Sequence, residues 1–272
     1  IIASQNANQV AANQFSYTTY DALGRIVEAG ALTPTVGISI REKTGTLVYT
    51  ATGNVVSTRV EDQYPQNISR DRVEVTRTRY NDLSIGAAEI FETVSDQSTY
   101  RSTTRNRVAG IYYYDQYSST TLERQYDHAI FYHYDIHGNV KELVQHDKQM
   151  ALTLDDPTSG MKRTQYEYDL ISGNVHRVTY QKGKADQFIH QYRYDADNRI
   201  VGVSTSDNGR IWEEDARYAY FSHGPLARTV LGARQVQGLD YAYTLQGWLK
   251  GVNGESLDPT ADMGGDGSST SD

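Results

Sequence analysis

The sequence predicts an all-β protein built from serial antiparallel β-hairpins. Three observations predict this fold class. A motif with two tyrosines and a glycine recurs along the chain, tyrosine and glycine each occur 22 times among 272 residues, and apolar and polar residues alternate after the motif. Aromatic residues favour strands, alternation places one strand face against a core, and a recurring motif indicates a serial architecture.

The motif has the consensus Tyr-x-Tyr-Asp-x-x-Gly-(Asn/Arg)-apolar and is clearest at 132–140. An early copy within 16–29 keeps the turn but has Thr18 at the first tyrosine, and the last two copies lack the Asp. Successive second tyrosines from Tyr134 onward are 34, 26, 26 and 23 residues apart, about the length of two strands and two connections. The residues assigned to the motif are Tyr20, Asp21, Gly24, Tyr132, Tyr134, Asp135, Gly138, Tyr166, Tyr168, Asp169, Gly173, Tyr192, Tyr194, Asp195, Asn198, Tyr218, Tyr220, Gly224, Tyr241, Tyr243 and Gly247.

Each copy is predicted to form one hairpin. Tyrosines at positions i and i+2 share a strand face, because side chains alternate along a strand. The Asp carboxylate is expected to accept turn N–H groups, while Gly supplies a positive φ. Asn198 replaces Gly in one copy, and Asn also tolerates this conformation. An isolated hairpin is marginally stable in water, so the hairpins are expected to stabilise one another in series.

Two interpretations of the tyrosine pairs remain open. In the structural interpretation, the rings form a ladder between successive hairpins and their hydroxyls meet water or a neighbour. In the binding interpretation, exposed tyrosine faces stack on sugar or another apolar cargo.

The other parts of the chain are organised around this repeat. Residues 1–15 are predicted to be extended or to start a strand, and no long helix is predicted. The expected divisions are a divergent β-rich region over 1–128, repeat hairpins over 129–253, and a disordered Gly/Ser/Asp-rich tail over 254–272. Strands within the divergent region are predicted at 46–50, 55–60, 72–80 and 111–114.

Composition excludes several functional classes. The chain has no cysteine, so it has no disulfide, no thiolate zinc site and no cysteine nucleophile. The formal charge of −8 argues against a nucleic-acid partner, and no apolar run is long enough to predict a membrane span. The first residues do not resemble a signal peptide, and we expect the chain to be an interior fragment of a longer polypeptide.

No catalytic, cofactor-binding or metal-binding residues are predicted. His133 and His137 have helical metal-ligand spacing but lie on opposite sides of a predicted hairpin turn, where that spacing has no meaning. Four histidines lie close together in sequence, and two sets of acids have a weak carboxylate-pair or calcium-loop character. These residues are His128, His133, His137 and His146, then Asp155 and Asp156, then Asp258, Asp262 and Asp266.

The Tyr-x-Tyr-Asp motif copies resemble the Tyr-Asp repeats of the Rhs and YD-repeat family, over 129–253 and again over 16–29. The segments 134–141 and 241–253 resemble the Rhs-like proteins of Bacteroidetes-type bacteria in particular. Relatives include insecticidal toxin-complex components, effectors of contact-dependent weapons, and teneurins. The resemblance implies a curved, spiralling sheet that closes into a hollow shell around a C-terminal toxin domain. The family's autoproteolytic aspartates are not carried over, because Asp258-Pro259 alone does not define that site.

The resemblance therefore implies a non-enzymatic shell segment of a large secreted or cell-surface bacterial protein. The expected partners are the rest of its own polypeptide shell and an enclosed toxin domain. An adhesion module that binds carbohydrate through tyrosine rows is the alternative. A hydrolase that uses His and Asp residues from 128–156 is a third, weaker hypothesis.

Overall fold

A computed structural model of the chain shows an architecture dominated by antiparallel strands. The prediction of an all-β chain of serial hairpins is confirmed. The structure describes residues 3–4, 6–12, 14–32, 48–49, 55–57, 72–83, 86–92, 94, 96–118, 121–151 and 160–253. The predicted disordered tail lies outside these residues.

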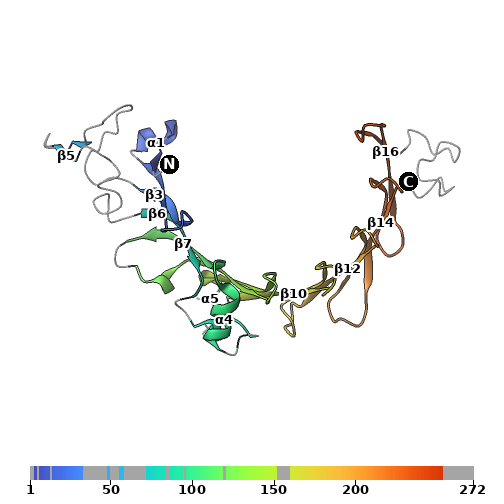
Figure 1. Cartoon of the computed structure of the whole chain (residues 1–272), viewed down its shortest axis with the longest axis horizontal. Coiled ribbons are helices and arrows are strands. Elements are labelled where there is room, and N and C mark those ends of the chain that lie inside the picture. Colours follow the sequence, from blue (N-terminus) through green and yellow to red (C-terminus); the bar gives the residue numbers. More distant parts are fainter. Residues whose placement is uncertain are drawn as a thin grey trace. The chain divides into compact units, whose positions relative to one another are not determined.

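The chain forms two compact units, Ile1–Lys162 and Arg163–Asp272. The boundary lies within strand β10 (Met161–Tyr168), inside the predicted repeat region rather than at its start. Each unit is built from hairpins that succeed one another in chain order (Figure 1).

The main sheet of unit 1 contains seven strands, whose spatial order equals their order in the chain. They are β1 (Ala3–Ser4), β2 (Phe15–Tyr20), β3 (Ile26–Leu32), β6 (Arg72–Tyr80), β7 (Val108–Tyr117), β8 (His128–Tyr134) and β9 (Val140–Asp147). A separate strand pair, β4 (Val48–Tyr49) and β5 (Val55–Ser57), overlaps two of the predicted strands.

Unit 1 also carries short helices. They are α1 (Ala7–Ala12), α3 (Ala87–Ile90), α4 (Gln97–Thr104), α5 (Lys148–Ala151) and the 3₁₀ turn η1 (Glu123–Gln125). The extended conformation predicted for 1–15 is wrong at α1. There, Asn6 and Gln9 each accept the other's backbone N–H through their side chains, at 3.0 and 2.9 Å, and so cap a short helix. Among the described residues, no helix is both long and apolar enough to cross a membrane.

A hydrophobic core lies between one face of the unit 1 sheet and the segment that carries α3 and α4. Helix α4 packs on β8 and lies on one side of the sheet (Figure 1). Its Tyr100 is fully buried and donates its hydroxyl to the Tyr132 carbonyl at 2.9 Å. Phe91, Tyr112 and Phe131 belong to the same buried cluster, so the helical segment substitutes for a second layer.

Unit 2 continues the hairpin series without helices among its described residues. From β10 onward its strands are β11 (Val175–Tyr180), β12 (Phe188–Tyr194), β13 (Ile200–Ser206), β14 (Glu213–Tyr220), β15 (Leu226–Leu231), β16 (Gln237–Tyr243) and β17 (Leu249–Val252). All neighbouring pairs from β10 to β17 are antiparallel.

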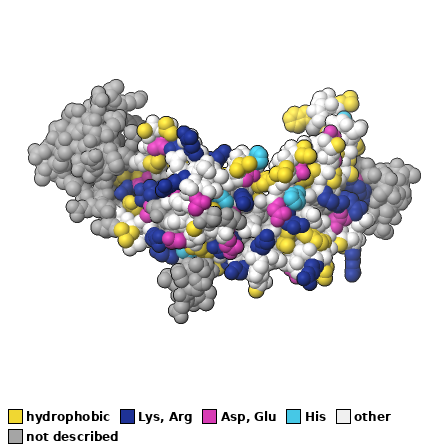
Figure 2. Space-filling model, turned by 60° about the horizontal axis from the view of Figure 1, so that its bottom comes forward, with side chains coloured by type: hydrophobic (Ala, Val, Ile, Leu, Met, Phe, Trp, Pro, Cys, Tyr) yellow, Lys and Arg dark blue, Asp and Glu magenta, His cyan; other side chains and the backbone are white. Residues whose placement is uncertain are grey.

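Unit 2 has little hydrophobic core. Ile189 and Ala216 are its only buried hydrophobic residues within the described range. Buried polar residues outnumber them: Thr179, Gln181, Ser206, Thr229 and Asp240. Basic and acidic side chains are interspersed on the face of the molecule shown in Figure 2. In unit 2, ion pairs such as Arg193–Glu214 and Arg228–Asp240 connect different strands. This sheet is a single layer held by ladder hydrogen bonds and polar pairs.

Candidate functional site

The Asp of the motif organises the hairpin turn. In the β12–β13 turn, Asp195 donates its backbone N–H to the Arg199 carbonyl at 2.9 Å. Its Oδ1 accepts the N–H groups of Asp197 and Arg199, both at 2.9 Å, and its Oδ2 accepts Nε of Arg199 at 2.7 Å. The Asp195 side chain therefore satisfies two backbone N–H groups of the five-residue loop 195–199, and the Asp195 carbonyl accepts a third, from Asn198. The carboxylates of Asp21, Asp135 and Asp169 accept turn N–H groups in the same way.

The residue that follows the variable turn positions, three in the 166–175 copy and two in the others, has a positive φ in every copy. The value is +77° at Gly24 and +61° at Asn198. Only Gly, and more rarely Asn, adopts this conformation at low cost, which accounts for both residue types at this position.

The last two hairpins keep the turn without the Asp. Phe221 and Thr244 stand at the Asp position, and their backbone N–H groups donate to Pro225 and Trp248 carbonyls at 2.9 and 2.8 Å. The Thr244 hydroxyl accepts the Trp248 N–H at 3.1 Å, in place of a carboxylate. The backbone loop is thus retained while its side-chain chemistry changes.

The turn carboxylates should make folding sensitive to acid. Hydrogen bonds from the backbone N–H of Arg199, and then from the Arg199 side chain, hold the pKa of Asp195 below its usual range. A lowered folded-state pKa gives stability that is present above the unfolded value of about 3.9 and is lost as pH falls through the folded value. We expect the urea midpoint of unit 2 to fall more steeply below pH 4 in the wild type than in Asp195→Asn. An identical pH dependence of the two proteins would contradict this assignment.

In the main strand series, a β-bulge occurs at the second tyrosine of each of the seven motif hairpins. The register shifts at this residue, and the tyrosine then pairs with the first apolar residue of the return strand. Tyr49 of the separate β4–β5 pair shows the same shift and pairs with Val55. The seven pairs are Tyr20 with Ile26, Tyr80 with Val108, Tyr134 with Val140, Tyr168 with Val175, Tyr194 with Ile200, Tyr220 with Leu226, and Tyr243 with Leu249.

In four hairpins the second tyrosine also links its hairpin to the preceding one. Its hydroxyl donates to the carbonyl of the first return-strand residue of that hairpin, a contact we call the tyrosine junction. It satisfies a carbonyl that points out of the preceding hairpin. The four examples are Tyr80 to Ile26 (3.0 Å), Tyr134 to Val108 (2.9 Å), Tyr194 to Val175 (2.7 Å) and Tyr220 to Ile200 (2.8 Å).

An arginine follows the positive-φ turn residue in three hairpins, and its guanidinium lies over the junction tyrosine of the next hairpin: Arg25 over Tyr80, Arg107 over Tyr134 and Arg199 over Tyr220. Arg199 pairs with Asp195 of its own turn and lies over the ring of Tyr220 in the next hairpin, 4.6 Å from the ring centroid. Arg25 makes the equivalent contacts with Asp21 and with Tyr80, whose centroid lies 4.1 Å away. The consensus motif includes the arginine position. The contact of this arginine with the tyrosine of the next hairpin cannot be predicted from the motif, because the two residues belong to different hairpins.

Removing one junction hydroxyl should weaken unit 2 measurably. We expect Tyr194→Phe to lower the free energy of unfolding by about 0.5–1.5 kcal/mol, the usual contribution of one hydrogen bond. The matched control is Tyr192→Phe, which removes a hydroxyl from the first tyrosine of the same pair. Urea denaturation followed by tryptophan fluorescence gives both values. Equal losses in the two variants would show that the junction hydroxyl has no special role.

One repeat was missed in the sequence because its turn is interrupted. Asn81 donates its backbone N–H to the Arg107 carbonyl at 3.1 Å, and its Oδ1 accepts the Asn106 N–H at 2.7 Å. Asn106 has a φ of +60°, like Gly24 and Asn198. The β6–β7 hairpin is therefore a copy of the motif in which residues 82–105, with α3 and α4, replace the two variable turn positions. Its sequence signal is Thr78-x-Tyr80-Asn81 together with Asn106-Arg107-Val108.

The candidate metal residues are not brought together. Among the described residues, no three His, Asp or Glu side chains are arranged to hold a metal ion. His146 shares a 2.7 Å hydrogen bond with Tyr126, and His128 lies 3.5 Å from Asp147. His133 is buried against Phe91, and burial, followed by the charge of Lys141, lowers its pKa to about 4. His137 is exposed in its turn. Asp155, Asp156, Asp258, Asp262 and Asp266 lie outside the described residues.

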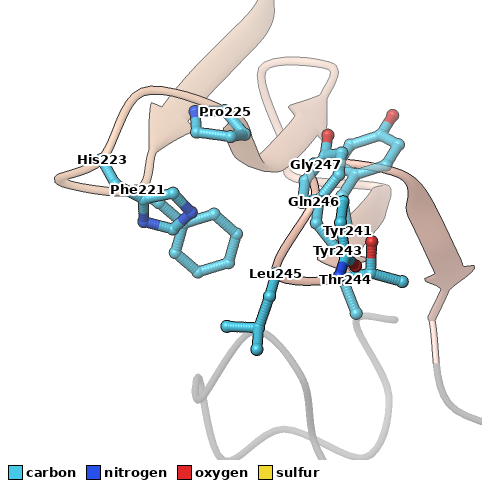
Figure 3. A pocket seen from close by; sticks show the side chains of 10 residues that line it. Phe221, His223, Pro225, Tyr241, Tyr243, Thr244, Leu245, Gln246 and Gly247 are labelled. Carbon is cyan, nitrogen blue, oxygen red and sulfur yellow. The ribbon is translucent and has the colours of Figure 1, made fainter.

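An open hollow of about 820 Å³ lies between the turns of the last two hairpins. Figure 3 shows Phe221 and His223 from one turn facing Tyr243 and Leu245 from the other hairpin. Phe221 stacks on His223 at 5.3 Å between ring centroids and meets Tyr243 edge-on at 6.3 Å. The hollow is formed by the two copies that lack the motif Asp.

No protein-family model matches the sequence, and no curated protein matches it. Several solved structures are similar at low identity. They include the crystal structures of TcdB2-TccC3-Cdc42 (13% identity, TM-score 0.48, covering 88% of this chain and 9% of that chain) and of TcdB2-TccC3-TEV (13%, 0.47, 92% and 10%). The Photorhabdus luminescens Tc holotoxin pore with a mutated TccC3 is also similar (11%, 0.35, 91% and 12%). The chain spans about a tenth of the length of these solved chains.

Proposed function

We propose that this chain is a structural wall segment of a large secreted or cell-surface Rhs/YD-repeat protein that encloses or presents a C-terminal toxin domain. One observation carries the proposal. Seven hairpins of one design occur in the main strand series of the described chain, and the same tyrosine junction joins four of them to the preceding hairpin. Its partners are then the other hairpins of its own polypeptide and the enclosed domain.

The mechanism is confinement. A sheet that closes on itself presents no free edge and separates its contents from solvent. A wall of this kind needs a continuous hydrogen-bonded layer rather than a thick core, and unit 2 provides such a layer with only two buried hydrophobic residues, Ile189 and Ala216, in its described part. Each junction fastens one hairpin to the next without adding a second layer.

Limited proteolysis of the natural polypeptide tests this proposal. We expect the domain that follows the wall to resist a protease that rapidly digests the same domain expressed alone. A variant without two junction hydroxyls (Tyr194 and Tyr220 to Phe) should lose protection sooner than a variant with Tyr192 and Tyr218 changed to Phe. Equal digestion of the enclosed and the isolated domain would contradict the proposal.

Carbohydrate binding is a second candidate, and the hollow in Figure 3 is the observation that favours it. Its size is that of a small-ligand site, and its aromatic rings are flanked by the polar groups of His223 and Gln246. Titration calorimetry with a panel of polysaccharides tests this candidate. Binding lost in Phe221→Ala but kept in Phe188→Ala would support it, and the absence of heat with every polysaccharide would dismiss it.

A further inference from the structure

Among the described residues, strand β17 has a strand partner on one side only. In the described part of the chain it pairs with β16 on one side and ends the strand order of the sheet. Three apolar side chains at this edge are largely exposed: Trp248 (74%), Leu249 (56%) and Val252 (45%). The corresponding residues of an interior hairpin, Arg199, Ile200 and Val203, are all partly buried.

These positions are the ones that receive the next hairpin elsewhere. Leu249 pairs with Tyr243 as Ile200 pairs with Tyr194, so the Leu249 carbonyl corresponds to the carbonyl that accepts the Tyr220 hydroxyl. The Trp248 carbonyl accepts the Thr244 N–H just as the Arg199 carbonyl accepts the Asp195 N–H. Trp248 therefore occupies the place of Arg199, whose guanidinium lies over the Tyr220 ring.

We infer that the β17 edge binds the outgoing strand of a further Tyr-x-Tyr hairpin, whose second tyrosine donates its hydroxyl to the Leu249 carbonyl and packs its ring on Trp248. The inference rests on the proposed wall function and identifies the partner at this edge. Its support is continuity with the interface already repeated between the hairpins of each unit. Strand addition supplies main-chain hydrogen bonds, and the tyrosine supplies specificity.

The edge is also protected against unspecific pairing. Lys250 is exposed in the middle of β17, and a lysine on an edge strand opposes the flat, repeated pairing that leads to aggregation. Because the strand is only four residues long, backbone pairing alone is weak. Recognition at Leu249 and Trp248 is therefore required for stable addition.

The test uses the whole 272-residue chain and a synthetic peptide that copies residues 188–206, the β12–β13 hairpin. This hairpin makes the tyrosine junction within the chain, from Tyr194 to Val175. The chain has two tryptophans and the peptide has none, so a Trp212→Phe protein reports on Trp248 alone. We expect a saturable change in Trp248 fluorescence on addition of the peptide.

Matched peptides make the result specific. A Tyr194→Phe peptide should bind about 3- to 10-fold more weakly, as the loss of one hydrogen bond implies, whereas a Tyr192→Phe peptide should bind like the parent. No saturable change, or equal binding of the Tyr194→Phe peptide, overturns the inference. A Trp248 signal that depends on protein concentration without peptide also overturns it, because a second copy then occupies the edge. Peptide binding does not require a closed wall, so this result and the protease-protection result can fail separately.

Discussion

Replacement of Phe131 by alanine is expected to lower the free energy of unfolding of unit 1 by about 3–5 kcal/mol, the range measured for buried phenylalanines. Phe131 is fully buried in β8 and lies edge-on to Tyr112 and Tyr126, at 5.6 and 6.1 Å between ring centroids. The covering helical segment and the sheet are fixed by other contacts, such as the bond from Tyr100 to the Tyr132 carbonyl. The site therefore cannot collapse fully around the cavity.

The two units allow this effect to be measured locally. Trp212 and Trp248 both lie in unit 2, so fluorescence follows unit 2, while hydrogen exchange of β7–β9 amides follows unit 1. We expect faster exchange in unit 1 with an unchanged fluorescence transition. Ile136→Ala in the exposed β8–β9 turn is the control and should alter stability by less than about 0.5 kcal/mol. A loss below about 1 kcal/mol in Phe131→Ala would mean that the cluster is not a tightly packed core.

The hairpins were predictable because their determinants are local. A positive φ after two variable residues requires Gly or Asn, and a loop with several free N–H groups requires a nearby acceptor such as Asp195. Strand alternation then places both tyrosines of a pair on one face. These constraints act within about ten residues, so they leave a readable trace in a single sequence.

The packing of the α3–α4 segment on the sheet of unit 1 was not predictable, because it depends on contacts between residues far apart in the sequence. Tyr100 reaches the Tyr132 carbonyl across 32 residues, and Asn81 bonds to Asn106 across an insert that separates the two halves of one turn. No local period indicates that such distant residues meet. The contact of Arg199 with the next hairpin could not be predicted from the sequence either, because its partner Tyr220 is brought near only by the packing of successive hairpins.

Unit 2 depends on polar pairs where unit 1 depends on a hydrophobic core. Its described strands bury only Ile189 and Ala216 among hydrophobic residues, so the sheet is held mainly by ladder hydrogen bonds and polar contacts, among which the Arg228–Asp240 ion pair is the most buried. The Arg228–Asp240 pair joins β15 to β16 at 2.6 Å, with side-chain exposures of 16% and 1%. Asp240 also accepts the Asn253 N–H through its carbonyl at 2.9 Å, next to the edge strand β17. Loss of this ion pair is therefore expected to weaken the attachment of the last hairpin to β15.

Asp240→Ala is expected to destabilise unit 2 by about 3–5 kcal/mol, because it leaves the mostly buried Arg228 guanidinium without its carboxylate. The urea midpoint from Trp212 and Trp248 fluorescence should fall strongly, while hydrogen exchange in β7–β9 stays unchanged. Asp207→Ala, at an exposed acid of the same unit, is the control.

A double variant separates an unpaired charge from a loss of packing. If the unpaired guanidinium causes the destabilisation, Arg228→Met combined with Asp240→Leu should recover most of the lost stability, since apolar residues of similar volume often replace a buried ion pair without loss. The double variant should then be more stable than Asp240→Ala alone. A double variant that is less stable than Asp240→Ala would show that the sheet needs the hydrogen-bonded geometry of this pair, and not merely charge neutrality, to hold β15 and β16 together.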